Sequence, residues 1–353
     1  MWLASETVKT AGLVVGKSRR VVVGLPARDE AGSIGDCLRA LDSAAARFGG
    51  PVTIVVGANN CSDDTACVAR RFKAKAATIV VEDVLLPPRL AHAGGARRHV
   101  MDRAAALAGS GGVVMTTDAD SCVDIGWIAA NVGEIANGAD AVAGMITFDA
   151  AARAELPMLA GRAAEWWLAT LHARLEHLID PRPHDPWPRH IWAWGASLAL
   201  TVETYRAVGG VPLVALAEDR ALADAVEYCG FRLRRSYAPM VYTSPRQSGR
   251  APGGFADLIA AYASDAATPC DAALEPTRTL WLRLRTRARL RAESGEAFRA
   301  AWGRIEAATP ALARKRLRPG DLAAEIACAE RLINALEQRA ARRADNRPAA
   351  LAA

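Results

Sequence analysis

Gly112-Val113-Val114-Met115-Thr116-Thr117-Asp118-Ala119-Asp120-Ser121 is the stretch that decides the fold. Its apolar first half predicts a short buried strand. Two carboxylates, Asp118 and Asp120, follow at the carboxyl end of that strand, which is the edge where open α/β sheets bind their ligands. Such a pair suits a hard divalent cation, and a bound cation can in turn hold a diphosphate. An Asp-x-Asp triplet alone is weak evidence, because many solvated turns contain one.

The first 150 residues alternate strands with helices, a pattern typical of a parallel sheet that is covered by helices on both faces. Apolar runs predict the strands, and apolar residues at helical spacing predict the helices. The predicted order is strand 21–25, helix 30–48, strand 52–56, helix 65–72, strand 78–81, helix 94–108, strand 112–116 and strand 139–148. We expect Pro26 to stop the first strand.

The pattern changes beyond residue 150. Four prolines between residues 181 and 188 predict a loop, since proline fits neither regular structure. Around that loop the sequence predicts helix 159–179, strand 191–201, helix 217–228 closed near Gly230, and a last strand 240–244. From about residue 274 the chain is rich in Arg and Ala and predicts helices that are interrupted at Pro310 and Pro319.

Composition is that of an ordinary globular protein, with 51% apolar and 23% charged residues. No apolar stretch reaches the roughly 18 residues that a membrane span needs, and the N-terminus lacks the long apolar core of a signal peptide. The seven cysteines are scattered and form no Cys-x-x-Cys pair, so they indicate neither a disulfide framework nor a zinc site. We therefore expect a reduced, cytoplasmic location.

The net charge of +6 is unevenly distributed, because residues 278–347 hold 17 Lys and Arg against 8 Asp and Glu. On a helix, Arg283, Arg287 and Arg291 align, with Leu284 among the residues that pack inward and the arginines facing solvent or an anionic surface. This basic region indicates either a solvated helical face or peripheral contact with the inner face of a membrane. We expect no nucleic-acid partner.

Polar loops follow the first two predicted strands as well. The first loop, residues 25–32, has no Gly-x-Gly-x-x-Gly, which argues against a dinucleotide-binding dehydrogenase. In the second loop, residues 57–65, Ser62 or Asp63 is placed to cap the next helix. Each loop alone is best read as a turn and cap. Together with the Asp118–Asp120 loop they converge on one edge of one sheet, as a nucleotide pocket requires.

These motifs, in this order, resemble an inverting family-2 glycosyltransferase of the GT-A fold, over roughly residues 20 to 255. The segments that carry the resemblance are residues 26–30, 59–65, 94–98, 118–120, 194–197, 209–210 and 218–219. The resemblance implies an α/β protein with a mostly parallel sheet flanked by helices and a C-terminal helical extension. We accordingly divide the chain into an N-terminal segment 1–19, a GT-A domain 20–265 and a basic helical region 266–353.

The resemblance also implies a reaction, in which a sugar moves from a nucleotide-sugar donor to an acceptor hydroxyl with inversion. Mn²⁺ or Mg²⁺ on Asp120 and Asp118 would neutralise the leaving diphosphate. Asp219, with Glu218 beside it, would act as general base on the acceptor. Trp194 and Gly195 would lie on the acceptor side. The implied donor-binding residues are Pro26, Arg28, Glu30, Asn59, Asp63, Arg97, Asp118, Arg246 and Arg250.

The sequence departs from the family pattern near Ala58, where many members have a base-reading Asp, and no His follows the last strand. The acceptor stays open between a glycan, a lipid-linked molecule and a small molecule. Two other functions stay open as well. A sugar-phosphate nucleotidyltransferase of similar fold would need a Gly-rich basic loop, which residues 24–27 do not form. A non-catalytic anion- or membrane-binding protein would have no need of Asp118, Asp120 and Asp219.

Simpler interpretations compete with several site residues. Glu218 and Asp219 also suit a helix N-terminus as plain dipole complementation. Arg246 and Arg250, taken alone, read as surface charge. Trp194 is interpreted equally as a sugar-stacking residue or as part of an aromatic core. His190, in the proline-rich loop, is expected at the surface.

Overall fold

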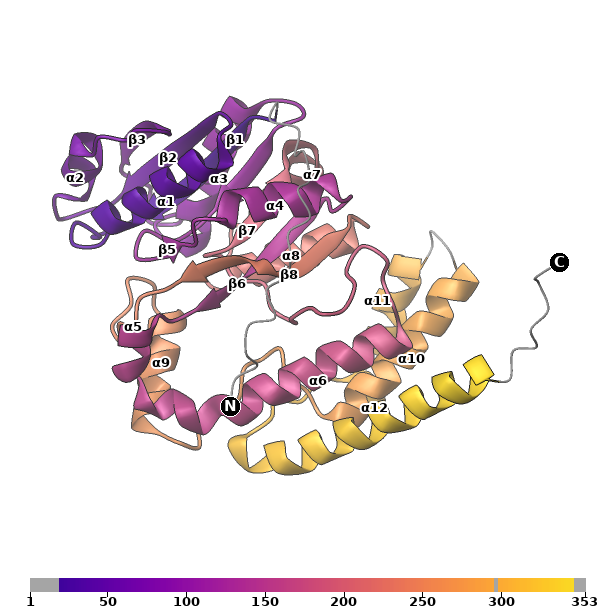
Figure 1. Cartoon of the computed structure of the whole chain (residues 1–353). Coiled ribbons are helices and arrows are strands. Elements are labelled where there is room, and N and C mark those ends of the chain that lie inside the picture. The colour runs from indigo at the N-terminus through magenta and orange to yellow at the C-terminus, as the bar shows by residue number, and fades with distance from the viewer. Residues whose placement is uncertain (1–18, 295–297, 346–353) are drawn as a thin grey trace.

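The computed structural model describes residues 19–294 and 298–345; the segments 1–18, 295–297 and 346–353 lie outside the described residues. One mixed sheet organises the first part of the chain, with helices on both of its faces (Figure 1). Its strand order is β3-β2-β1-β4-β7-β6-β8-β5. The predicted α/β class, with a mostly parallel sheet and a helical C-terminal extension, is confirmed.

The first four strands in this order run parallel. They are β1 (Val21–Ala27), β2 (Val52–Asn59), β3 (Thr78–Val84) and β4 (Val113–Thr116). β7 (Leu198–Thr201) joins them to the second half, because it pairs antiparallel with both β4 and β6 (Ala141–Thr147). β6 pairs parallel with β8 (Leu233–Tyr242), and the short β5 (Cys122–Val123) closes the far edge antiparallel to β8.

Alternating side chains of β1 divide the interior into two layers. Val21, Val23 and Leu25 point to one face, where they pack with helix α1 (Ile34–Phe48) and α4 (Trp127–Ala136). Val22 points to the other face, toward α3 (Ala93–Ala108), α7 (Val202–Ala207) and α8 (Glu218–Tyr228). Both layers are apolar, so the strand is a continuous run of valine and leucine rather than an alternating one.

A third apolar core lies away from the sheet. It joins α6 (Ala163–Ile179) to α10 (Thr277–Ser294) and α12 (Leu322–Asp345), which lie side by side in Figure 1. The domain division at residue 265 stays a prediction, and α6, from before that position, packs on helices from after it. The remaining helical elements are α2 (Thr65–Arg71), α5 (Ala150–Ala154), η1 (Pro157–Arg162), α9 (Phe255–Ser264), α11 (Phe298–Ala308), η3 (Pro310–Leu312) and η4 (Pro319–Asp321).

Three predicted strand limits differ clearly from the observed ones. The last strand, predicted over 240–244, is β8 at Leu233–Tyr242, because its pairing with β6 begins at Leu233, in a stretch of Arg and Ser that no apolar run marks. β1 continues through Pro26, where it pairs with β2 only, because its pairing with β4 ends at Gly24. Proline lacks an N–H, and it is tolerated at such a position because one side of the strand forms no ladder there.

The predicted strand 191–201 shrinks to its last four residues. In the segment before β7, the amide of Trp192 donates to a His190 ring nitrogen and the amide of Gly195 donates to Asp219. Side chains accept these amides in place of a neighbouring strand.

Five arginines stand at every second position from 283 to 291 in α10, and the predicted solvent-facing orientation is wrong for three of them. Arg283, Arg287 and Arg291 face inward and pair with carboxylates of the protein. Arg285 and Arg289, on the opposite side of the helix, are exposed as expected. The basic face of α10 is therefore an internal ion-pair surface. No helix among the described residues is long and apolar enough to cross a membrane.

Candidate functional site

Three loops meet at the carboxyl edge of β1, β2 and β4, because these strands are parallel neighbours in the sheet. The loops span residues 28–33, 60–64 and 117–121. Two of them turn through left-handed backbone at non-glycine residues, Asp29 with φ 54° and Asn60 with φ 51°. Such positions cost free energy and are frequent at binding sites. The predicted convergence of the three loops is confirmed.

Arg97 connects the Asp-x-Asp loop with the Glu-Asp pair. Its guanidinium donates to Asp118 Oδ1 at 2.8 Å, to Glu218 Oε1 at 3.0 Å and to the Gly195 carbonyl at 2.9 Å. The side chain is 7% exposed. Burial alone would lower the pKa of Arg97, but the Asp118 and Glu218 carboxylates raise it above its ordinary value. Arg97 is thus a permanent cation that ties the two acidic motifs together.

Gly195 has no side chain because Arg97 occupies the space beside it. A Cβ on Gly195 would lie 2.5 Å from Nη2 of Arg97. The sequence pattern marks Gly195 as a motif residue but gives no reason for it; the reason is this close approach. The predicted acceptor-side glycine is therefore part of the support of the acidic cluster.

Asp120 is the most buried carboxylate of the Asp-x-Asp loop, with 13% of its side chain exposed. Arg246 donates to its Oδ2 at 2.8 Å and to both carboxylate oxygens of Glu30, at 2.7 and 2.9 Å. Burial, and then the neighbouring charge of Asp118, raise the pKa of Asp120 to about 6. Two predicted donor-binding residues, Glu30 and Arg246, are thus brought against the predicted metal ligand.

Asp219 lies on the other side of Arg97. Its Oδ2 accepts the Gly195 amide at 2.8 Å and its Oδ1 accepts the Arg220 amide at 2.7 Å. Burial, and then Glu218, raise the pKa of Asp219 above its ordinary value. The residue before the pair, Ala217, is in the left-handed region with φ 58°, which sets the direction in which α8 begins. A carboxylate with a raised pKa and a fixed position suits a general base.

The first two loops are fixed to each other by side-chain caps. Asp63 accepts the amides of Ala31 at 3.0 Å and Thr65 at 2.9 Å, and Asp29 accepts the amide of Ser62 at 2.6 Å. Arg250 donates to the Asp29 carbonyl at 2.8 and 3.1 Å. The structure therefore places Asp63 and Arg250 as supports of this edge, while their predicted contact with a donor stays a prediction.

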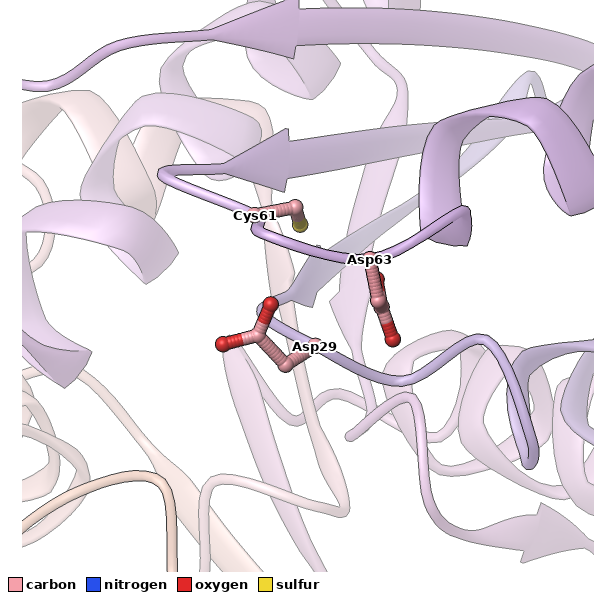
Figure 2. A group of neighbouring side chains, drawn as sticks. All are labelled: Asp29, Cys61 and Asp63. Carbon is pink, nitrogen blue, oxygen red and sulfur yellow. The ribbon is translucent and has the colours of Figure 1, made fainter.

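Asp29, Cys61 and Asp63 also form a group whose ligand-type atoms all lie within 4.8 Å of one another (Figure 2). Burial raises the pKa of the Cys61 thiol, which keeps it protonated and a poor metal ligand. Oxygens of both carboxylates already accept backbone amides, from Ser62 to Asp29 and from Ala31 and Thr65 to Asp63. We interpret this group as loop closure and assign no metal to it.

Trp194 is half-buried in an aromatic stack. Its ring lies 5.0 Å from that of Trp192 and 5.5 Å from that of His190, between centroids. His190 is buried, and burial lowers its pKa to about 3. The expectation that His190 lies at the surface is wrong, because its ring packs in this stack and contacts the Ser236 carbonyl at 3.2 Å. A sugar contact of Trp194 stays a prediction.

The remaining predicted residues are less engaged. Pro26 lies in β1 beside Gly57, and Asn59 is buried at the end of β2. Arg28 is exposed at the rim. Sequence reasoning missed Thr116, which accepts from Arg97 at 2.9 Å, and the left-handed Ala217. Neither has a sequence signal, since one reads as a strand residue and the other as a helix start.

The donor set of the Asp-x-Asp loop fits a hard cation such as Mn²⁺ or Mg²⁺. Asp118 and Asp120 offer only oxygen atoms, which these ions prefer. The mutual repulsion of the two carboxylates contributes to the raised pKa of Asp120, and a bound cation would relieve it. Asp118 keeps 37% of its side chain exposed, so a ligand can reach it.

No protein-family model matches the chain, and no curated protein matches it. Solved structures do show similarity. Glucosyl-3-phosphoglycerate synthase from Mycobacterium tuberculosis, in complex with Mn²⁺, UDP and phosphoglyceric acid, is 19% identical; the match covers 70% of this chain and 78% of that one, with a TM-score of 0.42.

Two further structures contain bound nucleotide sugars. The mannosyltransferase PcManGT from Pyrobaculum calidifontis, with GDP-Man and Mn²⁺, is 18% identical over 83% of this chain and 81% of that one, with a TM-score of 0.44. TarS 1–349 from S. aureus, with UDP-GlcNAc, is 12% identical over 82% and 73%, with a TM-score of 0.47. These identities and TM-scores are too low to assign an activity to this chain.

Proposed function

We propose that the protein is a metal-dependent glycosyltransferase, which moves a sugar from a nucleotide-sugar donor to an acceptor hydroxyl with inversion. One observation carries the proposal: buried Arg97 binds Asp118 of the Asp-x-Asp loop and Glu218 of the Glu-Asp pair at once. A donor-side acidic motif and a candidate base are thereby held at one sheet edge, where α/β proteins bind ligands.

Each charged group then has a role in this proposal. Asp120 and Asp118 would hold Mn²⁺ or Mg²⁺, which supplies positive charge to the leaving diphosphate. Arg246 contacts Asp120 and would therefore donate to the same leaving diphosphate as the metal. Asp219 accepts the proton of the acceptor hydroxyl, and the Gly195 and Arg220 amides keep its carboxylate oriented. Trp194 and Gly195 form the acceptor side.

The same fold supports a competing reaction, nucleotidyl transfer to a sugar phosphate. It is disfavoured here because such an enzyme needs a glycine-rich basic loop after the first strand, and residues 24–27 do not form one. A non-catalytic function is disfavoured because Asp219 is buried with a raised pKa beside Glu218, and carboxyl groups with such a shifted pKa are frequent at functional sites.

Peripheral membrane contact and a cytoplasmic location stay predictions. The membrane prediction depended on the basic C-terminal region, and three of its arginines, at 283, 287 and 291, are paired with carboxylates inside the protein. The exposed arginines of α10 are Arg278, Arg285 and Arg289.

A panel of nucleotide sugars with Mn²⁺ tests the proposed function. The protein should release nucleoside diphosphate from at least one donor, only when the metal is present, and Asp219→Asn should slow that release. Release of pyrophosphate from a nucleoside triphosphate and a sugar phosphate would instead establish the nucleotidyltransferase. Neither product, with a folded protein and bound nucleotide, would leave a binding function.

A further inference from the structure

A cavity of about 220 Å³ lies on the side of α8 that faces the C-terminal helices. Its wall combines α6, the proline-rich loop, α8 and α10 with the segment around Arg314. Seven of its lining residues are arginines: 182, 189, 220, 235, 283, 287 and 314. None of them belongs to a motif that the sequence marks as functional.

The cavity shares a wall with the candidate active site. Arg220, which lines the cavity, follows Asp219 directly, and its amide donates to that carboxylate at 2.7 Å. Trp192 and Ala193 line the cavity from the opposite direction and lead into Gly195, whose amide also holds Asp219. A ligand in the cavity would therefore touch the same backbone that positions the candidate base.

Arginines outnumber carboxylates in the inner half of this region. Six arginines share five carboxylates there: Glu134, Glu176, Asp180, Asp185 and Glu227 pair with Arg182, Arg189, Arg234, Arg235, Arg287 and Arg291. The local field is positive, because the pKa of Glu176 is held well below its ordinary value by the arginines despite burial. Arg182 also keeps a buried Nε without a hydrogen-bond partner.

In the outer half the carboxylates outnumber the arginines by one. Arg220, Arg283 and Arg314 face Asp224, Asp271, Glu275 and Glu306 there. Burial raises the pKa of both Asp224 and Glu275, so these two carboxyls ionise less readily than ordinary ones. Arg220 and Arg314 are the least satisfied cations of the wall: each makes one ion pair, at 3.1 and 3.8 Å, with side chains 40% and 57% exposed.

We propose that this cavity is a binding site for a small anion, a phosphate or carboxylate group, with Arg220 and Arg314 as its entrance residues. The site is made jointly by α8 and the C-terminal helices, which gives the basic region a function within the protein. Its place behind Asp219 fits the anionic group of an acceptor; this acceptor role alone rests on the proposed function, whereas anion binding does not.

Calorimetric titration of inorganic phosphate into the full chain, against chloride at equal ionic strength, tests the site. The parent should bind phosphate, and Arg314→Ala should weaken binding about tenfold or more, which is about 1.4 kcal/mol. Arg285→Ala is the matched control, because Arg285 lies on the exposed side of α10 and does not line the cavity. Equal phosphate affinity in the parent and Arg314→Ala, or no binding beyond chloride, would overturn the proposal.

Two probes separate an acceptor group from a free anion. Glycerol 3-phosphate carries alcohol hydroxyls beside its phosphate, whereas inorganic phosphate has no alcohol hydroxyl. Faster metal-dependent nucleoside diphosphate release with glycerol 3-phosphate alone indicates an acceptor site; binding of both without that change indicates a free-anion site. Manganese-dependent nucleotide binding, measured on the same samples, reports on the proposed function separately, so either conclusion can fail without the other.

Discussion

The guanidinium of Arg246 lies 2.8 Å from Oδ2 of Asp120. It therefore already pairs with one of the carboxylates to which we assign a divalent cation. The same guanidinium binds Glu30 from the first loop, which links the loop after β1 to the loop after β4. Metal binding would thus compete with an internal ion pair, or share its carboxylate with it. Both the internal ion pair and metal binding therefore depend on whether Asp120 is ionised.

The ionisation of Asp120 should cost stability in the unliganded protein. Its pKa is about 6 in the folded state, above that of the unfolded chain, so the folded state takes up the proton more readily. The cost therefore grows as the pH rises from about 4 to 6 and is complete above that. Asp120→Asn should be more stable than the parent by about 3 kcal/mol near neutral pH without metal, and this gain should vanish near pH 4.

Urea unfolding at the two pH values measures this difference. Asp36→Asn is a suitable control, since Asp36 is 65% exposed and pairs only with an exposed arginine. If the parent is more stable than Asp120→Asn near neutral pH, the ion pair with Arg246 fully offsets the cost of burying the ionised Asp120 carboxylate, and the prediction is wrong.

Arg97→Met should destabilise the fold strongly. The change leaves Asp118 and buried Glu218 without their shared cation, and such losses cost about 3–5 kcal/mol. Arg39→Met removes a pair whose partners are 67% and 65% exposed, and should have little effect. Denaturant midpoints of both variants decide the matter; a change for Arg97→Met as small as that for Arg39→Met would show that the two acidic motifs are not electrostatically coupled.

Asp219→Asn should leave donor binding nearly unchanged and reduce turnover about a hundredfold or more, the usual range for acid–base catalysis. The two amides donate to different oxygens of Asp219, so the single oxygen of asparagine can accept only one of them and its NH2 group faces the other. A thermal melt of the variant therefore accompanies the assay, so that loss of the base is separated from loss of this backbone anchor. Steady-state rates and nucleotide affinity are measured on the same preparation. Lost nucleotide affinity with preserved turnover would move Asp219 to the donor site.

The layout of the sheet was predictable because its signals are local. Val21–Leu25 and Val113–Thr116 are apolar runs long enough to read as buried strands, and polar residues follow both. The convergence of their loops then follows from parallel pairing alone. Helix α4 was not predicted, since it begins at a glycine without a side-chain cap. Strand β7 was predicted too long at its start, because the His190 and Asp219 side chains accept the backbone amides of Trp192 and Gly195 there.

The contacts that complete the site could not be predicted. Arg97 lies 121 residues from Glu218 and 21 from Asp118, and no local pattern shows that one guanidinium reaches both. The direction of Arg283 and Arg287 depends likewise on carboxylates of distant segments, such as Glu176 on α6. Helical periodicity aligned these arginines correctly, but it could not say whether their face meets solvent or protein.

Protons should compete with the metal at the Asp-x-Asp loop. Below the pKa of Asp120, about 6, manganese-dependent nucleotide binding should weaken by about tenfold per pH unit, since the metal needs the ionised carboxylate. Titrations at several pH values between about 5 and 8 measure the slope. An affinity that is constant across this range would exclude Asp120 as the titrating ligand.

Binding of UDP and GDP to the parent and to Asp120→Asn, with and without Mn²⁺, tests the central claim most directly. The account predicts that the parent binds at least one of them in a manganese-dependent manner and that Asp120→Asn loses the manganese-dependent part while remaining folded. Equal manganese-dependent affinity in the two proteins would contradict it.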